Sequence, residues 1–123
     1  MGLYNQVDVG LDPFPYNGTT TTCDALWMGV PVVTLAGKTH VARVGLSLVS
    51  QLGFPEWSVE TPDAYVAKCR ELAGDLTGLA NLRIGLREQM RQSPLCDATR
   101  FVGHLETAFR AMWQQWCGQQ LDK

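Results

Sequence analysis

The sequence predicts an α/β protein in which a short parallel sheet of two to three strands carries about five helices. Apolar runs at residues 7–12 and 32–35 are typical of strands that are buried on both faces of a sheet. A helical segment from about Thr20 to Met28 lies between them. Strand, helix and strand within so short a span make a βαβ unit, whose crossover is expected to be right-handed.

The loop between the first strand and the first helix is rich in proline, asparagine and glycine. Pro13 and Pro15 exclude a helix and hold the backbone extended. Gly18 allows a sharp turn or a close approach to a ligand. The helix that follows is expected to end at Gly29, and its inward residues are Ala25, Leu26 and Trp27.

A second helix is expected from Thr39 to about Leu52, with Gly53 as its stop signal. Apolar residues recur there at helical spacing, at Val41, Val44, Leu48 and Leu52, with Leu46 and Val49 beside them. A short third strand is expected at 57–59.

The second half of the chain is expected to be helical. Thr61 is the N-cap of a helix over 62–74, and a further helix spans 76–92. Asp97 is expected to cap a last helix that runs to about Cys117. The predicted inward residues of the 62–74 helix are Tyr65, Val66, Cys69, Leu72 and Ala73.

The last helix carries an apolar stripe made by Phe101, Leu105, Ala108, Phe109, Met112 and Trp116. Packing of this stripe against its own domain is the favoured interpretation. Two or three strands offer little surface for five helices, however, so a partner lobe or another protein is the alternative partner for the stripe. His104 lies on the opposite side of the helix and is predicted to face solvent.

The start of the first helix is the candidate binding site. Backbone N–H groups at a helix start lack partners within the helix, and the helix dipole favours negative charge there. The hydroxyls of Thr19, Thr20 and Thr21 suit phosphate oxygens, and Asp24, one turn further, suits the hydroxyls of a ribose. Together with Asn17 and Gly18 these residues form a candidate nucleotide-sugar site. The alternative is that the threonines are an N-cap and Asn-Gly is a turn, and the spacing leaves both open.

No catalytic constellation and no metal-ligand spacing emerges from the sequence. Gly37-Lys38-Thr39 is not a P-loop, because the motif needs a glycine where Val32 lies in a strand. Arg43 and His40 are more typical of surface groups than of ligand-binding groups. We therefore expect no catalytic residue, no metal and no cofactor on this chain.

Composition excludes several functional classes. The chain has 123 residues and an apolar fraction of 46%, which suits a globular domain with a core. A formal net charge of -2 gives no reason to expect nucleic acid or an anionic membrane as partner. The four cysteines are scattered and the first residues lack the features of a signal peptide, so a reducing cytoplasm is expected.

Several segments resemble the O-linked N-acetylglucosamine transferase family, the SPINDLY-like group whose members often carry tetratricopeptide repeats. The resemblance covers nearly the whole chain and is carried by residues 11–18, the threonine run, residues 24–34, residues 42–45, Ser93-Pro94-Leu95 and the helix end near Met112-Trp113. It implies a glycosyltransferase with the Rossmann-like, two-lobe GT-B architecture, of which this chain is the last part of the donor-binding lobe. The expected donor is a UDP-sugar, UDP-N-acetylglucosamine, and the expected acceptor is a protein serine or threonine.

The resemblance also assigns roles to residues of this chain. It implies that Thr19, Thr20 and Thr21 hold the donor diphosphate and that Asp24 holds the ribose. Some relatives have histidine where Thr19 stands, which weakens the expectation for that side chain. The phosphate-contacting lysine and the uracil-holding residues of the family are expected outside these 123 residues, as are the N-terminal lobe and the repeats.

The sequence thus predicts one domain over 1–123, with a βαβα nucleotide-binding part at 1–60 and C-terminal helices at 61–123. The first functional hypothesis is the donor-binding portion of a glycosyltransferase, inactive as an isolated chain because half a cleft cannot exclude water. It treats the chain as a piece of a larger enzyme. The second is a non-enzymatic protein-interaction domain that uses the apolar last helix.

Overall fold

The computed structural model describes residues 2–121 and confirms the predicted α/β class. Across these residues the strands β1 (Gly10–Leu11), β2 (Val32–Leu35) and β3 (Ser58–Val59) form a three-stranded parallel sheet in the order β1-β2-β3. All four residues of the central strand β2 are buried, because helices cover both of its faces.

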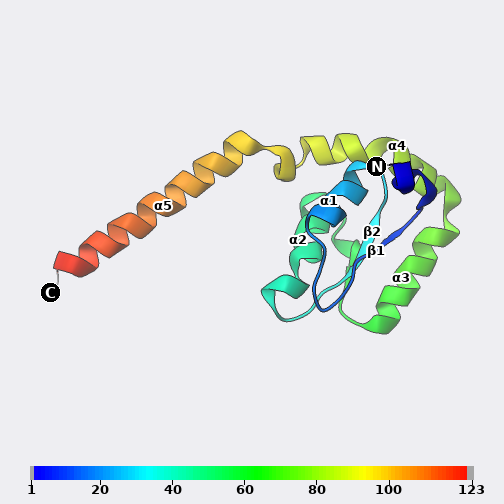
Figure 1. Cartoon of the computed structure of the whole chain (residues 1–123), viewed down its shortest axis with the longest axis horizontal. Helices are drawn as coiled ribbons and strands as arrows, with labels where there is room; N and C mark the ends of the chain where they lie inside the picture. Colours follow the sequence, from blue (N-terminus) through cyan, green and yellow to red (C-terminus); the bar gives the residue numbers. More distant parts are fainter. Residues whose placement is uncertain (1, 122–123) are drawn as a thin grey trace.

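Helices α1 (Thr20–Trp27) and α2 (Val44–Gln51) lie on one side of the sheet, and α3 (Pro62–Gly74) lies on the other (Figure 1). Helix α4 (Leu76–Gln92) packs against α1 and α3 near the chain's N-terminus. Short 3₁₀ turns complete the domain: η1 (Gly2–Gln6), η2 (His40–Ala42), η3 (Pro55–Trp57) and η4 (Pro94–Cys96).

The hydrophobic core lies where α1, α2 and α4 meet the sheet. Leu26, Val49 and Leu86, one from each helix, are almost completely buried there. The whole buried cluster consists of Ala25, Leu26, Val30, Val32, Val49, Leu52, Trp57, Leu86 and Met90. The prediction that Ala25 and Leu26 point inward is therefore confirmed, and Trp27 is half-buried against the same cluster.

Helix ends follow the predicted signals. Gly29 (φ 79°) and Gly53 (φ 90°) adopt the left-handed conformation after α1 and α2. The Thr61 side chain accepts a hydrogen bond from the Ala64 N–H at 3.2 Å and so caps α3, as predicted. The Asp97 carboxylate accepts one from the Arg100 N–H at 2.9 Å and caps α5.

Several predicted elements have different bounds. β3 starts at Ser58 instead of 57, and α5 runs to Leu121 instead of about Cys117. The strand expected at 7–12 is short, because only Gly10 and Leu11 pair with β2, and the prediction that it is buried on both faces is wrong, because Leu11 is 63% exposed at the edge of the sheet. The helix expected from Thr39 to Leu52 is divided into η2 and α2 at Arg43, whose φ is -128°. The Gly37 N–H donates to the Ala42 carbonyl at 2.8 Å and the Arg43 guanidinium donates to the Gly37 carbonyl at 3.0 Å, so the chain folds back on itself before α2 begins.

The inward face of α3 is narrower than predicted. Tyr65, Cys69 and Leu72 are half-buried, but Val66 is 49% exposed and Ala73 is exposed. Helix α3 packs on a sheet of only three strands, and this sheet is too narrow to cover the outer residues.

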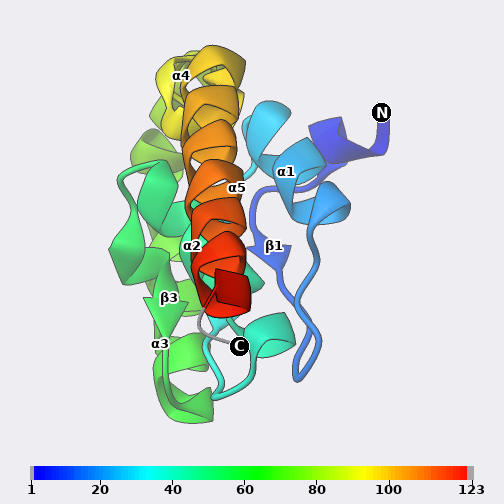
Figure 2. The same ribbon diagram turned by 90° about the vertical axis from the view of Figure 1, so that its left-hand side faces the viewer.

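Helix α5 (Ala98–Leu121) extends away from the rest of the domain (Figure 1), and in Figure 2 it lies in front of the domain. The expectation that its apolar stripe packs on its own domain is wrong: Phe101 is 63% exposed, Phe109 58% and Trp116 53%. The Ser93 hydroxyl donates to the Met90 carbonyl at 2.7 Å and accepts from the Leu95 N–H at 3.2 Å, which turns the chain outward before α5 starts. The predicted exposure of His104 is confirmed.

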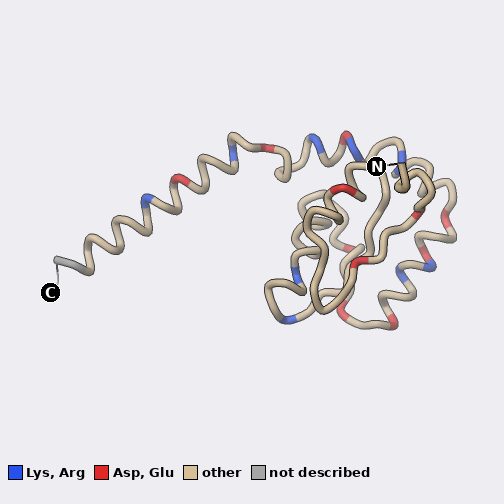
Figure 3. The backbone as a smooth tube through the Cα atoms, viewed as in Figure 1, with Lys and Arg blue, Asp and Glu red and all other residues tan. Residues whose placement is uncertain are grey.

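Charge is sparse along α5 (Figure 3). Within its described span the charged residues are Arg100, Glu106 and Arg110. Leu105, Met112 and Trp113 are also exposed, so the surface of this helix is largely apolar. Among the described helices, none combines the length and hydropathy that crossing a bilayer requires.

Candidate functional site

The loop after β1 leads into α1 at the edge of the sheet where the parallel strands end. Ligands of parallel α/β proteins bind outside this edge. Thr19, Thr20 and Thr21 are exposed there and Asp24 is half-buried. Of the predicted site residues, these four and Gly18, which is also half-buried, are therefore accessible from solvent.

The start of α1 has no side-chain cap among the residues that the structure describes. Thr19 occupies the N-cap position, but its side chain makes no capping hydrogen bond. The alternative prediction, that the threonines serve only as a helix N-cap, is therefore wrong for Thr19. Hydroxyls and first-turn N–H groups at this helix start are left to face solvent or a ligand, and the helix dipole favours an anionic one.

Asn17 has a different role from the exposed threonines. Its side chain is 1% exposed and both of its polar groups are used within the chain. The amide nitrogen donates to the Pro13 carbonyl at 3.1 Å, and Oδ1 accepts from the Gly45 N–H at 3.2 Å. Asn17 thus joins the loop to the start of α2, from beneath the site.

Two further buried side chains support the loop. The Thr22 hydroxyl donates to the Gly18 carbonyl at 3.1 Å. Asp12, 3% exposed, accepts from the Gly18 N–H at 2.7 Å through Oδ1 and from the Thr34 hydroxyl at 2.6 Å through Oδ2. Burying polar groups without partners is costly, and here these groups are hydrogen-bonded.

Sequence reasoning missed Asp12, Thr34 and Gly45 as parts of this site. The signal that could have found them is an acidic residue that directly follows a short apolar segment predicted as a strand, because such an acid needs partners within the chain if it is buried. Thr34 is the polar residue in an otherwise apolar β2. An ideal Cβ on Gly45 would lie 2.5 Å from Oδ2 of Asp12, so only glycine fits against this pair.

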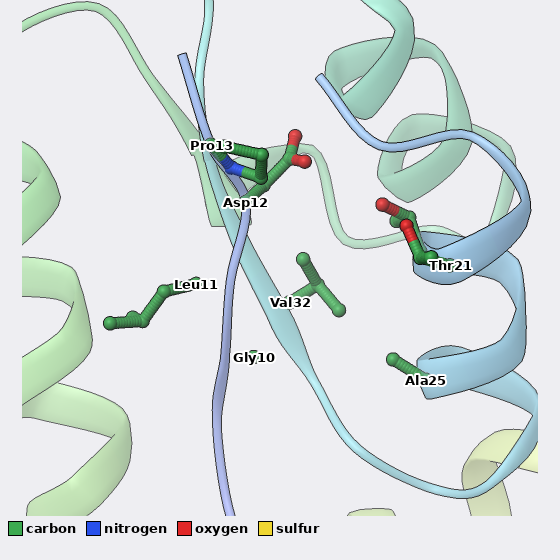
Figure 4. A pocket seen from close by; sticks show the side chains of 8 residues that line it. Gly10, Leu11, Asp12, Pro13, Thr21, Ala25 and Val32 are labelled. Atoms are coloured by element: carbon green, nitrogen blue, oxygen red, sulfur yellow. The ribbon is translucent and has the colours of Figure 1, made fainter. Parts of the chain in front are cut away.

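A small hollow lies between β1 and α1 (Figure 4). Figure 4 shows the Asp12 carboxylate and the Thr21 hydroxyl on opposite sides of it. Its volume is about 140 Å³, whereas ligand pockets run from roughly 300 to 1,000 Å³. It is lined by Gly10, Leu11, Asp12, Pro13, Thr21, Thr22, Ala25 and Val32. This hollow suits a few waters or one small group, not a nucleotide.

A larger hollow lies where Thr19 faces the η2 turn and α2. Its volume of about 410 Å³ falls in the range of ligand pockets. It is lined by Thr19, His40, Arg43, Val44, Ser47 and Leu48. Thr19 from the predicted site therefore shares a hollow with Arg43 and His40, which sequence reasoning had treated as surface groups, while Asp24 lines neither hollow.

The protonation of two groups near the site is set by burial. Burial raises the pKa of Cys23, and the neighbouring charge of Asp24 raises it further, so the thiol stays protonated at neutral pH. Burial also raises the pKa of Tyr65 to about 12. Its hydroxyl stays neutral and donates to the backbone carbonyl of Asp12 at 3.2 Å.

A metal site is not apparent in the part of the chain that the structure describes. No three histidine, cysteine, aspartate or glutamate side chains within residues 2–121 come together to hold an ion. The polar groups at the α1 start are hydroxyls, backbone N–H groups and one carboxylate, which are groups able to hydrogen-bond with phosphate oxygens or sugar hydroxyls.

Residues 4–105 match the sequence pattern of glycosyl transferase family 41. The chain belongs to this family. A relative from Solanum lycopersicum, named probable UDP-N-acetylglucosamine–peptide N-acetylglucosaminyltransferase SPINDLY, is 46% identical over 117 residues, which are 95% of this chain and 13% of the relative. The corresponding Arabidopsis thaliana protein is 45% identical over the same share of both chains. A UDP-N-acetylglucosamine–peptide N-acetylglucosaminyltransferase of Caenorhabditis elegans is 34% identical over 109 residues, which are 89% of this chain and 10% of the relative.

A solved structure of a mutant O-GlcNAc transferase from Thermobaculum terrenum has the same fold. It superposes with a TM-score of 0.87 at 42% identity, over 96% of this chain and 23% of that one. The family 41 chain is therefore part of a GT-B fold, as the resemblance implied. It spans about an eighth of the length of the plant relatives that it matches, 13%.

Proposed function

We propose that the chain is the donor-binding portion of a family 41 glycosyltransferase and that it binds a UDP-sugar, with UDP-N-acetylglucosamine as the expected donor. In this proposal Thr19, Thr20 and Thr21 bind the diphosphate at the start of α1. Asp24, one turn along the helix, accepts hydrogen bonds from the ribose hydroxyls. The names of the plant and nematode relatives support the choice of donor.

One observation carries the proposal: three exposed hydroxyls stand at an α1 start that has no side-chain cap, at the carboxyl edge of a parallel sheet. The hollow of about 410 Å³ beside Thr19 adds the guanidinium of Arg43. Donors at this helix start neutralise an anionic group without a metal, through hydrogen bonds and the helix dipole. The same groups stabilise the charge on a departing diphosphate.

The chain's own residues bind and orient the donor, and none of them is proposed as a general base. Transfer of a sugar needs a closed cleft from which water is excluded. The Thr19–Thr21 hydroxyls are exposed in this chain, so the donor bound here would face water. We therefore propose that these residues alone hold the donor and do not transfer sugar, and that transfer needs the second lobe of the GT-B architecture.

The second lobe is also the proposed partner of α5. The apolar face of that helix is exposed from Phe101 to Trp116, and the TM-score of 0.87 over 96% of the chain supports its extended position. An apolar surface of this length is typical of an interface rather than of a free surface.

The four free cysteines support a reducing compartment, the cytoplasm, as the place of this activity.

Titration of amide chemical shifts with UDP tests the donor site. We expect shifts that saturate at millimolar UDP and are largest from Gly18 to Asp24. Uridine, which lacks the diphosphate, tests whether the diphosphate is needed for binding. GDP, which carries the diphosphate on another base, tests whether uracil is needed. Absence of any shift in this segment with UDP would refute the proposal.

The second candidate function is a non-enzymatic protein-interaction domain, and the exposed stripe of α5 is the observation that favours it. This function predicts a stable self-associated or partner-bound state through α5, without nucleotide binding. Sedimentation of the wild type and of Phe109→Glu would distinguish the two. A dimer that Phe109→Glu dissociates, together with no response to UDP, would favour the interaction domain.

A further inference from the structure

One buried carboxylate holds the loop of the candidate site from below. Asp12 is 3% exposed, and each of its polar groups has a partner. Its N–H donates to the Val33 carbonyl at 3.0 Å, and its carbonyl accepts from the Tyr65 hydroxyl at 3.2 Å. Its side chain accepts from the Gly18 N–H at 2.7 Å and from the Thr34 hydroxyl at 2.6 Å. Asp12 is therefore fixed to β2 and α3 and in turn fixes Gly18.

Gly18 is the residue from which the exposed threonines start. Its carbonyl accepts from the Thr22 hydroxyl, so both of its backbone polar groups are held by buried side chains. An ideal Cβ on Gly18 would lie 2.6 Å from the Thr21 hydroxyl and 2.8 Å from that of Thr22. The loop backbone thus lies directly against the first turn of α1. A shift of Gly18 would move the hydroxyls of Thr19 and Thr21 with it.

The two partners of the Asp12 side chain explain why an acid stands there. The Gly18 N–H can only donate, so Oδ1 must accept, and in this structure Oδ2 accepts from the Thr34 hydroxyl. A carboxylate accepts at both oxygens, whereas an asparagine amide accepts at only one. A hydrogen bond from an N–H to a carboxylate is also shorter and stronger than one between neutral groups.

We propose that Asp12 is a positioning residue for the donor diphosphate. The inference rests on the proposed donor site and deepens it. Asp12 is buried and acts through the Gly18 N–H, which it holds so that the first turn of α1 is already arranged for the diphosphate. Preorganised donors of this kind bind more tightly because they need no reordering on binding.

The test uses three variants of the 123-residue chain. Asp12→Asn keeps the shape of the side chain but removes the charge and one acceptor. Thr34→Val removes the hydroxyl that bonds Oδ2 and keeps the shape, and Thr34→Ser keeps that hydroxyl. For each variant we would measure the Kd for UDP and the hydrogen exchange of the Gly18 amide, at a temperature where thermal unfolding shows the variant to be folded.

We expect Asp12→Asn to bind UDP roughly tenfold more weakly, the effect of losing one hydrogen bond to a charged group. The Gly18 amide should exchange faster in the same variant by a larger factor than a core amide such as that of Leu26 in α1, because a loss of global stability alone would act on both. Thr34→Val should also weaken UDP binding, whereas Thr34→Ser, which keeps the hydroxyl, should bind UDP as the wild type does. Asp63→Asn, an exposed acid in the first turn of α3, is the matched control and should leave UDP binding unchanged.

Three outcomes would overturn the inference in different ways. A folded Asp12→Asn that binds UDP as the wild type does, with an unchanged Gly18 amide, refutes the positioning role and leaves the donor site standing. A wild type that does not respond to UDP refutes both. If Asp12→Asn does not fold, equal UDP affinities of Thr34→Val and Thr34→Ser refute the positioning role.

Discussion

Gly45→Ala places a methyl group where α2 crosses β2, directly over the buried Asp12–Thr34 pair. The added Cβ would lie 2.5 Å from Oδ2 of Asp12 and 2.7 Å from Cβ of Thr34. Thr34 is completely buried and Asp12 is fixed by four hydrogen bonds, so neither can move away freely. The Gly45 N–H also donates to Oδ1 of Asn17, which ties the same backbone to the loop of the candidate site.

Opposing effects determine how far Gly45→Ala changes the free energy of unfolding. Alanine is favoured over glycine in a helix by roughly 1 kcal/mol. Overpacking a close-packed interior costs about 1–3 kcal/mol, and loss of the Asp12–Thr34 hydrogen bond costs roughly 1–3 kcal/mol more. We expect Gly45→Ala to lower the free energy of unfolding by about 1–5 kcal/mol. Gly85→Ala in α4 is the matched control: its Cβ would meet nothing within 4 Å, so the helix preference alone predicts a gain of up to ~1 kcal/mol.

Urea unfolding followed by circular dichroism would measure both variants. The midpoint should fall for Gly45→Ala and rise or stay for Gly85→Ala, with similar slopes. A Gly45→Ala variant as stable as Gly85→Ala would refute the close contact between α2, Asp12 and Thr34. It would also remove the buried network as an explanation for the arrangement of the loop.

Leu26→Ala should lower the free energy of unfolding by about 2–5 kcal/mol, because Leu26 is completely buried in the core; thermal or urea unfolding would measure this. Asp24→Ala should weaken UDP binding about fivefold, the effect of roughly 1 kcal/mol, and leave binding of inorganic pyrophosphate unchanged, because Asp24 is proposed to bind the ribose; calorimetric titration would separate the two ligands. Tyr65 should titrate at about 12, above the ordinary pKa of 10. Folding favours the neutral form of Tyr65, so its contribution to the free energy of unfolding is complete below pH 10 and is lost as the pH rises toward 12. The free energy of unfolding of Tyr65→Phe should therefore fall less steeply with pH in that range.

Other results would contradict these expectations. An unchanged unfolding midpoint for Leu26→Ala would mean that the core is not packed around it. Equal losses of UDP and pyrophosphate affinity for Asp24→Ala would place Asp24 at the diphosphate instead of the ribose. A Tyr65 ultraviolet titration at the ordinary value would mean that burial does not keep its hydroxyl neutral.

Local signals were enough to predict much of the fold. The bounds of α3, α4 and β2 agree with the sequence prediction at both ends. Strand β2 is marked by a continuous apolar run, and the two helices are marked by residues at their starts. Thr61 and Pro62 start α3, and the Asp75 carboxylate accepts a hydrogen bond from the Gly78 N–H at the start of α4. Such signals act within a few residues and are visible in one sequence.

Features that depend on distant parts of the chain were missed. β1 is short because pairing depends on where β2 lies, whereas the break at Arg43 is local and depends on hydrogen bonds with Gly37, six residues earlier. The periodic stripe of α5 predicted an apolar face correctly, but periodicity does not say what covers that face. For the candidate site, the exposed threonines and Asp24 could be proposed from spacing, whereas Asp12 and its partner on β2 are 22 residues apart and became apparent only in the fold.

Helix α5 contacts the rest of the domain at η4 and extends away from it, so a rotation at η4 moves the far end of the helix most. Its 24 residues give a rod of roughly 36 Å at about 1.5 Å per residue. A rotation of roughly 10° at η4 would therefore carry the far end through ~6 Å, about one helical turn. Small changes in the angle at Ser93–Asp97 would therefore appear as large displacements at the far end of α5, relative to any surface that this helix contacts.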